Sequence, residues 1–238
     1  MKYLSKLPVL TAICATLGLV CLCLRQWLLR TGIDDKGLFT AFHPGMIVSM
    51  LLLAAALCVL VLALRQQQVY RFRNCALSIV SMVFFAIGYS SAAWKLLLGR
   101  AQTLSVIAGI LGIVSAVCAL CIAFALLRKI KLHPFIYCPA VLFLMFLLVC
   151  RYQQWSGEPE LQQYLFQMLS VISLMISAYH RAALEADKKG ARNYLLISRA
   201  AVFFCIAAIP GSVYGPLYGC CAVAIILDGF TVSTKQGA

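Results

Sequence analysis

The chain is poor in charged residues, and acidic residues are especially scarce. Only 11% of its 238 residues are charged, and just 7 of them are Asp or Glu. A soluble domain keeps roughly 25% charged residues to cover its surface. This chain has 63% hydrophobic residues and a mean hydropathy of +0.96. It lacks the charge that a water-exposed surface needs, so we expect it to lie in a lipid bilayer.

Common catalytic and nucleotide-binding motifs are also missing from the sequence. H-E-x-x-H, G-x-S-x-G and G-x-x-x-x-G-K-[ST] do not occur, so these motifs indicate no enzyme activity. Asp34 and Asp35 stand well apart from His43, which is too little to predict a metal site. We therefore expect no metal and no cofactor. The twelve cysteines lie mostly inside hydrophobic runs, where cysteine behaves as a small apolar residue.

Long hydrophobic runs dominate what the sequence does contain. Most of them approach the ~20 residues that a membrane-spanning helix needs. The runs predict an all-α, polytopic transmembrane helix bundle that forms one integral membrane domain over 1–238. The segments "CLRQWLLRTG" and "CRYQQWSGEP" indicate two parallel four-helix halves, 1–131 and 132–238, although ordinary residues at two helix ends explain the similarity equally well. The eight runs cover 7–29, 43–64, 75–98, 103–127, 136–154, 161–184, 193–209 and 215–233.

The segment "PGSVYGP" at 210–216 decides the number of spans. A turn between two helices gives eight spans, whereas a re-entrant break that lines a cavity gives seven. We favour the turn, because Pro216 suits the first turn of a helix. Tyr214 and Tyr218 would then lie at the outer headgroup level. Gly215 and Gly219 would form a small packing face.

The distribution of Lys and Arg predicts the orientation. With eight spans and the N-terminus inside, 13 of the 20 Lys and Arg residues fall on inner segments, 6 lie at outer ends and Arg199 lies within a run. Cytoplasmic loops collect Lys and Arg, so we expect both termini to be cytoplasmic. This rule also accounts for the net charge of +13 without a nucleic-acid partner.

A stripe of polar residues follows the run at 161–184. The residues recur at spacings of three and four, so they share one face of a helix. This polar stripe either lines the path of a small-molecule solute or forms a helix–helix seam, in which Ser and Gln bond to neighbouring helices. Its members are Gln163, Gln167, Ser170, Ser173, Ser177 and His180.

Two ionisable residues lie deep in the last two runs. Arg199 and Asp228 reach matching depths on helices of opposite direction, at ~1.5 Å per residue, so we expect an intramembrane ion pair between them. Alternatively, Arg199 extends to the headgroups while Asp228 meets water, or the two residues couple ions or protons.

Two further sets of residues suggest packing roles. Arg25, Lys95 and Arg151 close the outer ends of three runs, where each either complements a helix C-terminus or helps to attract an anionic solute. A row of small residues in the run at 103–127 predicts a close-packing face. The row consists of Ser105, Ala108, Gly112, Ala116, Ala119 and Ala123.

The segments "GIDDKGLFTAFHPG" and "RYQQWSGEPELQQY" resemble those of uncharacterised polytopic membrane proteins of anaerobic Gram-positive bacteria. The resemblance implies a bacterial plasma membrane, and it carries no activity or site residues. Three functions stay open: a small-solute transporter or membrane-embedded solute-binding component, a noncatalytic structural or partner-binding protein, and a lipid-modifying enzyme. The expected partners are the lipid bilayer, a small solute, and a second copy or a partner membrane subunit.

Overall fold

The computed structural model describes residues 6–32, 44–64, 70–72, 76–99, 103–130, 132–155, 161–187 and 191–234. These residues form eight α-helices, one short 3-10 helix and two short strands. Each predicted hydrophobic run matches one α-helix, which confirms the all-α bundle. The elements are α1 (Lys6–Thr31), α2 (Pro44–Leu64), β1 (Tyr70–Phe72), α3 (Ala76–Leu98), α4 (Thr103–Arg128), η1 (Pro134–Tyr137), α5 (Cys138–Trp155), α6 (Leu161–Asp187), α7 (Ala191–Ala208), α8 (Gly215–Phe230) and β2 (Val232–Thr234).

Among the residues that the structure describes, four helical segments are long and apolar enough to cross a membrane. They are Leu10–Thr31, Ala76–Leu98, Thr103–Arg128 and Pro134–Gln154. Shorter apolar stretches lie within α2, α7 and α8. A helix satisfies its own backbone hydrogen bonds, which suits it to lipid. The fold is thus compatible with a membrane-embedded protein, while the number of spans and the two four-helix halves stay predictions.

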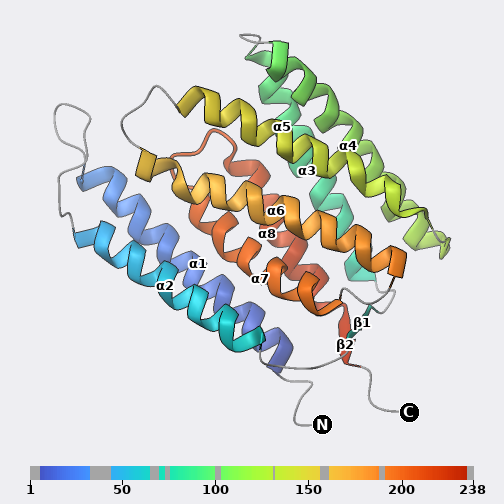
Figure 1. The fold of residues 1–238 in the computed structure, drawn as a ribbon, viewed down its shortest axis with the longest axis horizontal. Helices are drawn as coiled ribbons and strands as arrows, with labels where there is room; N and C mark the ends of the chain where they lie inside the picture. Colours follow the sequence, from blue (N-terminus) through green and yellow to red (C-terminus); the bar gives the residue numbers. More distant parts are fainter. Residues whose placement is uncertain are drawn as a thin grey trace.

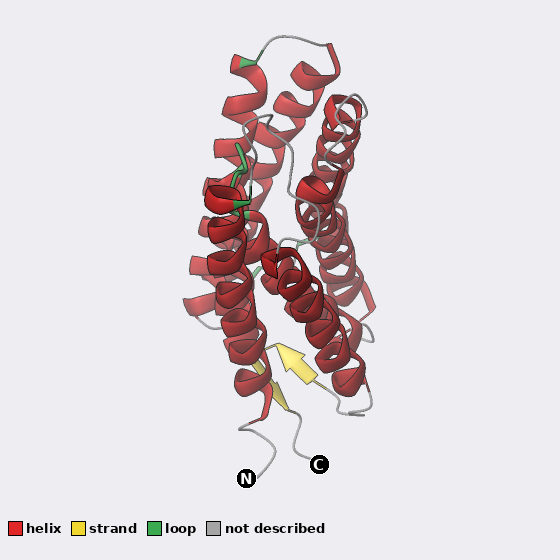
Figure 2. Ribbon diagram, turned by 90° about the vertical axis from the view of Figure 1, so that its left-hand side faces the viewer, coloured by secondary structure: helices red, strands yellow, loops and turns green. Residues whose placement is uncertain are grey.

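The helices run side by side along one direction (Figures 1 and 2). In Figure 1, α6, α7 and α8 lie between α1 and α2 on one side and the group of α3, α4 and α5 on the other. α8 packs against α3 and α7, and α7 also packs against α1 and α6. Phe143, Leu147, Val202, Leu217 and Tyr218 are fully buried in the resulting core.

The two strands join the bundle at one end. β1 pairs antiparallel with β2, with Tyr70 opposite Thr234. The pairing places the connection from α2 to α3 beside the C-terminal end of α8, and the start of α1 lies at the same end of the bundle (Figure 1). We call this end the strand end. The opposite end, which carries residues 209–214 between α7 and α8, is the turn end.

Residues 209–214 form a turn between two helices, as the sequence predicts. Gly211 has a φ of 70°, which L side chains rarely adopt, and Pro216 lies in the first turn of α8. The side chains of Tyr214 and Tyr218, which we expect at the outer headgroup level, are buried in the bundle and so face neighbouring helices; their depth in a bilayer stays a prediction. Their burial follows from the way α8 packs between its neighbours.

Small residues bring α4 close to its neighbours. Every member of the predicted small-residue row is buried, so the packing face is confirmed. A Cβ on Gly112 would lie 2.8 Å from the Cβ of Ala93 and 2.9 Å from the ring of Phe143. The prediction for Gly215 and Gly219 is wrong, since a Cβ added at either position would meet only Ile209 in the adjoining turn, at 3.6 Å and 4.0 Å, and no neighbouring helix.

Candidate functional site

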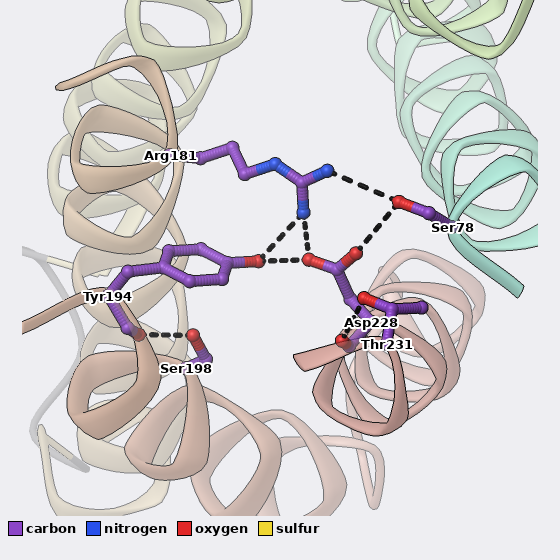
Figure 3. A network of polar contacts seen from close by, with 6 residues as sticks. All are labelled: Ser78, Arg181, Tyr194, Ser198, Asp228 and Thr231. Carbon is purple, nitrogen blue, oxygen red and sulfur yellow. Dashed lines mark hydrogen bonds and ion pairs between the residues drawn. The ribbon is translucent and has the colours of Figure 1, made fainter. Parts of the chain in front are cut away.

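A buried charged cluster lies near the strand end, where α3, α6, α7 and α8 meet (Figure 3). Asp228 of α8 is fully buried, and Arg181 of α6 is nearly so. The two form an ion pair through Arg181 Nη1 and Asp228 Oδ2. The Tyr194 hydroxyl donates to the same carboxylate oxygen at 2.5 Å. The Ser78 hydroxyl donates to Oδ1 at 3.2 Å.

Arg181 completes the cluster by contacting the same two hydroxyl groups. Its Nη1 donates to the Tyr194 hydroxyl at 3.2 Å, and its Nη2 donates to Ser78 Oγ at 3.4 Å. Cζ lies 5.6 Å from the centre of the Tyr194 ring. One carboxylate therefore receives hydrogen bonds from three helices, which offsets much of the cost of burying its charge.

Local hydrogen bonds hold two members of the cluster in place. The Ser198 hydroxyl donates to the carbonyl of Tyr194, one turn earlier on α7. Thr231 donates its hydroxyl to the carbonyl of Asp228 at 2.7 Å and its backbone N–H to the same oxygen at 3.0 Å. These bonds satisfy the last turn of α8 and fix the backbone that carries the carboxylate.

The partner of Asp228 differs from the sequence-based prediction. Asp228 pairs with Arg181 rather than with Arg199. Arg199 is buried on α7 and lies within electrostatic range of Cys14 on α1. Equal depth places two residues at the same height in the bundle, but it does not say how each helix is rotated about its axis. Arg199 lies about 100° around α7 from Ser198, which is one turn from the cluster residue Tyr194. The missed signal is that Arg181 follows Ser177 by four residues and so extends the polar stripe.

A small cavity adjoins the cluster. Its wall is mostly apolar and comes from α3 to α7 and η1. Polar groups reach it from Ser115, Ser177, Arg181 and Tyr194. The volume of the cavity that the centres of water molecules can reach is about 40 Å³. One water needs roughly 10–15 Å³ on this measure, so the cavity has room for about three waters or for a solute of similar size.

The polar stripe faces the bundle interior along most of its described length. Gln167, Ser170, Ser173 and Ser177 are buried, and Ser177 lines the cavity. The Ser170 and Ser173 hydroxyls donate to carbonyls of their own helix, at 2.7 Å and 3.0 Å. His180 is half-buried and meets the ring of Tyr179 edge-on. The Gln163 side chain lies outside the described residues.

Three cations from different helices hold the turn end. Arg25 of α1 donates to the carbonyl of Ala207 and lies 4.8 Å from the Phe166 ring centre. Lys95 of α3 donates to the carbonyl of Val213. Arg151 of α5 lies 4.3 Å from the Tyr214 ring centre. The three cations that the sequence places at outer helix ends therefore contact the same region, which is the end of α7 and the turn that follows it.

Fold and site together define an α-helical bundle, compatible with a membrane-embedded protein, that holds a buried ion pair beside a small cavity. Comparison of the chain with protein-family models, curated proteins and solved structures finds no match. Within the described residues, no group of three or more His, Cys, Asp or Glu side chains could hold a metal ion. The cavity and the cluster are therefore the features that indicate function.

Proposed function

We propose that this protein is an integral membrane protein that binds a small solute in the cavity beside Arg181, as a transporter or as a membrane-embedded solute-binding component. The observation that carries the proposal is the cavity itself. A mostly apolar pocket with a few convergent polar groups is the usual form of a small-molecule site. Ionisable residues inside a helical membrane bundle also mark functional positions more often than not.

Several features support eight spans with both termini cytoplasmic. The pairing of β1 with β2 brings the end of α2 and the end of α8 to one end of the bundle, as an even number of spans requires. The excess of Lys and Arg on the segments at this end supports a cytoplasmic strand end. The resemblance to bacterial membrane proteins supports the plasma membrane as the location. A second copy or a partner membrane subunit fits the same proposal.

The test is native mass spectrometry of the purified protein in mild detergent, with and without a blocked cavity. Ala178→Leu adds volume at the cavity wall, because Ala178 lines it. Ala54→Leu is the matched control, since Ala54 lies exposed on α2. We expect a small molecule to remain bound to the wild type and to Ala54→Leu but not to Ala178→Leu. Equal occupancy of all three proteins, or a wild-type chain with no bound solute, contradicts the proposal.

The alternative function is that of a noncatalytic structural or partner-binding membrane protein. The observation that favours it is the self-contained bonding of the stripe, where Ser170 and Ser173 donate to their own helix. Such a helix face needs no solute to satisfy its polar groups. Retention of a protein partner by a chain that carries no solute would favour this function.

A further inference from the structure

We infer that the ligand of the cavity is uncharged, with a short apolar skeleton and one hydrogen-bonding group. The inference rests on the proposed function, because it names the class of solute that the same cavity takes. It follows from the position of the ion pair relative to the cavity wall. Arg181 and Tyr194 belong to both the wall and the cluster around Asp228.

The charge at the cavity wall is already balanced. Asp228 pairs directly with Arg181. The positive charge of the guanidinium group at the wall is therefore already balanced by a carboxylate. An anionic solute would have to compete with Asp228 for the guanidinium group. A cationic solute would approach Arg181 with a charge of the same sign. Either ion would bring an unmatched charge into a bundle interior where desolvation is costly.

The rest of the wall also favours a neutral, compact solute. Its other potentially ionisable groups are Cys118, Tyr89 and Tyr137, which are uncharged at neutral pH in ordinary surroundings. The Ser115 hydroxyl donates to the carbonyl of Leu111 at 2.6 Å. Ser177 remains as a wall hydroxyl suited to an alcohol or amide group of the solute. With room for about three waters, the cavity matches a skeleton of about three carbons.

Three probes that differ only in charge test the inference: propan-1-ol, propionate and propylammonium. Binding is measured by saturation-transfer NMR on the full-length protein in detergent micelles at neutral pH. The signal from Ala178→Leu, in which the cavity is filled, is subtracted to remove binding to the micelle. We expect the wild type to bind propan-1-ol at least tenfold more tightly than either ion. Equal or tighter binding of an ion overturns the inference but leaves the cavity a binding site.

Charge substitutions provide a second test. Because this test uses several variants, it remains informative if one of them fails to fold. Asp228→Asn keeps the shape of the carboxylate but unbalances Arg181, so propionate binding should strengthen at least tenfold. The double variant Arg181→Gln with Asp228→Asn removes both charges and should keep the preference for propan-1-ol. Arg25→Gln removes a buried cation at the turn end and should leave the preference unchanged.

The outcomes separate the two ideas. If the double variant or Arg25→Gln shifts the preference toward an ion, or folded Asp228→Asn does not favour propionate, the charge argument is wrong. If none of the three probes distinguishes the wild type from Ala178→Leu, the inferred ligand class is wrong, while the proposed function is decided separately by whether the wild type retains a solute. The native mass spectrum of the wild type then shows independently whether any solute is bound.

Discussion

At the strand end Arg181 is held by a carboxylate, whereas at the turn end Arg25 and Lys95 are held by backbone carbonyl groups. Arg151, also near the turn end, has its guanidinium over the Tyr214 ring. The bundle thus contains two solutions to the same problem, the placement of long cationic side chains among apolar helices. One uses an opposite charge, and the other uses dipoles and aromatic rings.

The difference shows how a chain with few acidic residues can accommodate many cationic side chains. With 20 Lys and Arg against 7 Asp and Glu, cations outnumber acidic residues almost threefold. The free carbonyls at a helix C-terminus carry partial negative charge, and an aromatic face attracts a cation. The turn end therefore uses cations to fix the fold. At the strand end a neutral pair leaves a cavity wall without net charge.

The largest predicted effect comes from removing the carboxylate at the strand end. Asp228→Ala leaves Arg181 buried without its ion-pair partner, and breaking such a pair typically costs about 3–5 kcal/mol. We expect a loss of this size in the free energy of unfolding, measured by reversible denaturation in detergent. Because native stability is often only about 5–15 kcal/mol, the yield of folded protein should also fall.

A double variant separates the charge from the packing. Arg181→Met with Asp228→Leu removes both charges and keeps apolar volume at the site. Replacing a buried pair with well-packed apolar residues is often neutral or stabilising, so the double variant should recover most of the loss. A double variant as unstable as Asp228→Ala would show that the hydrogen bonds of Ser78 and Tyr194, rather than the ion pair, hold this end together.

The sequence predicts the helices well because their signals are local. Run length and bounding charges locate all eight helices, and Pro216 marks the start of α8 as expected. The deep position of Asp228 is also evident from its run. Its partner is not, because helix rotation depends on packing among α3, α6, α7 and α8. Arg199 and Arg181 are both deep enough to pair with Asp228, and depth alone does not choose between them.

The cavity and the turn-end contacts are harder still to predict from sequence. The cavity wall combines residues from five helices and η1, so it exists only once the helices are assembled. The polar stripe did point to α6 as an interior helix, and Ser177 is its link to the cavity. Arg25, Lys95 and Arg151 stand out in the sequence as outer-end cations. Their common target appears only when the α7–α8 turn is in place.

A second prediction concerns the turn end, where Arg25 links α1 to the end of α7. Arg25→Leu removes a charge-assisted hydrogen bond to Ala207 and the contact with Phe166. Hydrogen bonds to charged groups contribute about 1.5–3 kcal/mol, so we expect a loss of roughly 2–3 kcal/mol in the same unfolding assay. Arg25→Lys keeps the charge and should recover part of it. A full loss with Lys would mean that guanidinium geometry, not charge, holds α7.

A matched pair of tyrosine substitutions sharpens the comparison. Tyr194 acts through its hydroxyl, which donates to Asp228, so Tyr194→Phe should cost about 2 kcal/mol. Tyr214 meets Arg151 through its ring, so Tyr214→Phe should change the free energy of unfolding by less than about 0.5 kcal/mol. Tyr214→Leu should cost about 0.5–1 kcal/mol through the lost cation–π contact. Equal effects of the two Phe variants would remove the distinction between the ends.

A smaller effect than those of Asp228, Arg25 and Tyr194 is predicted in the turn itself. Gly211 has a φ of 70°, and an L residue in that conformation costs roughly 1 kcal/mol, so Gly211→Ala should lower the unfolding free energy by about that amount. The added Cβ would meet Leu29 Cδ1 at 3.1 Å, the end of a side chain that can move. Gly219→Ala is the control, because the nearest atom lies 4.0 Å from its Cβ position and alanine favours a helix by about 0.5–1 kcal/mol. We expect opposite signs for the two variants, with a loss at the left-handed position 211 and a gain within the helix at 219. A neutral Gly211→Ala would mean that the turn relaxes despite the three cations that hold it.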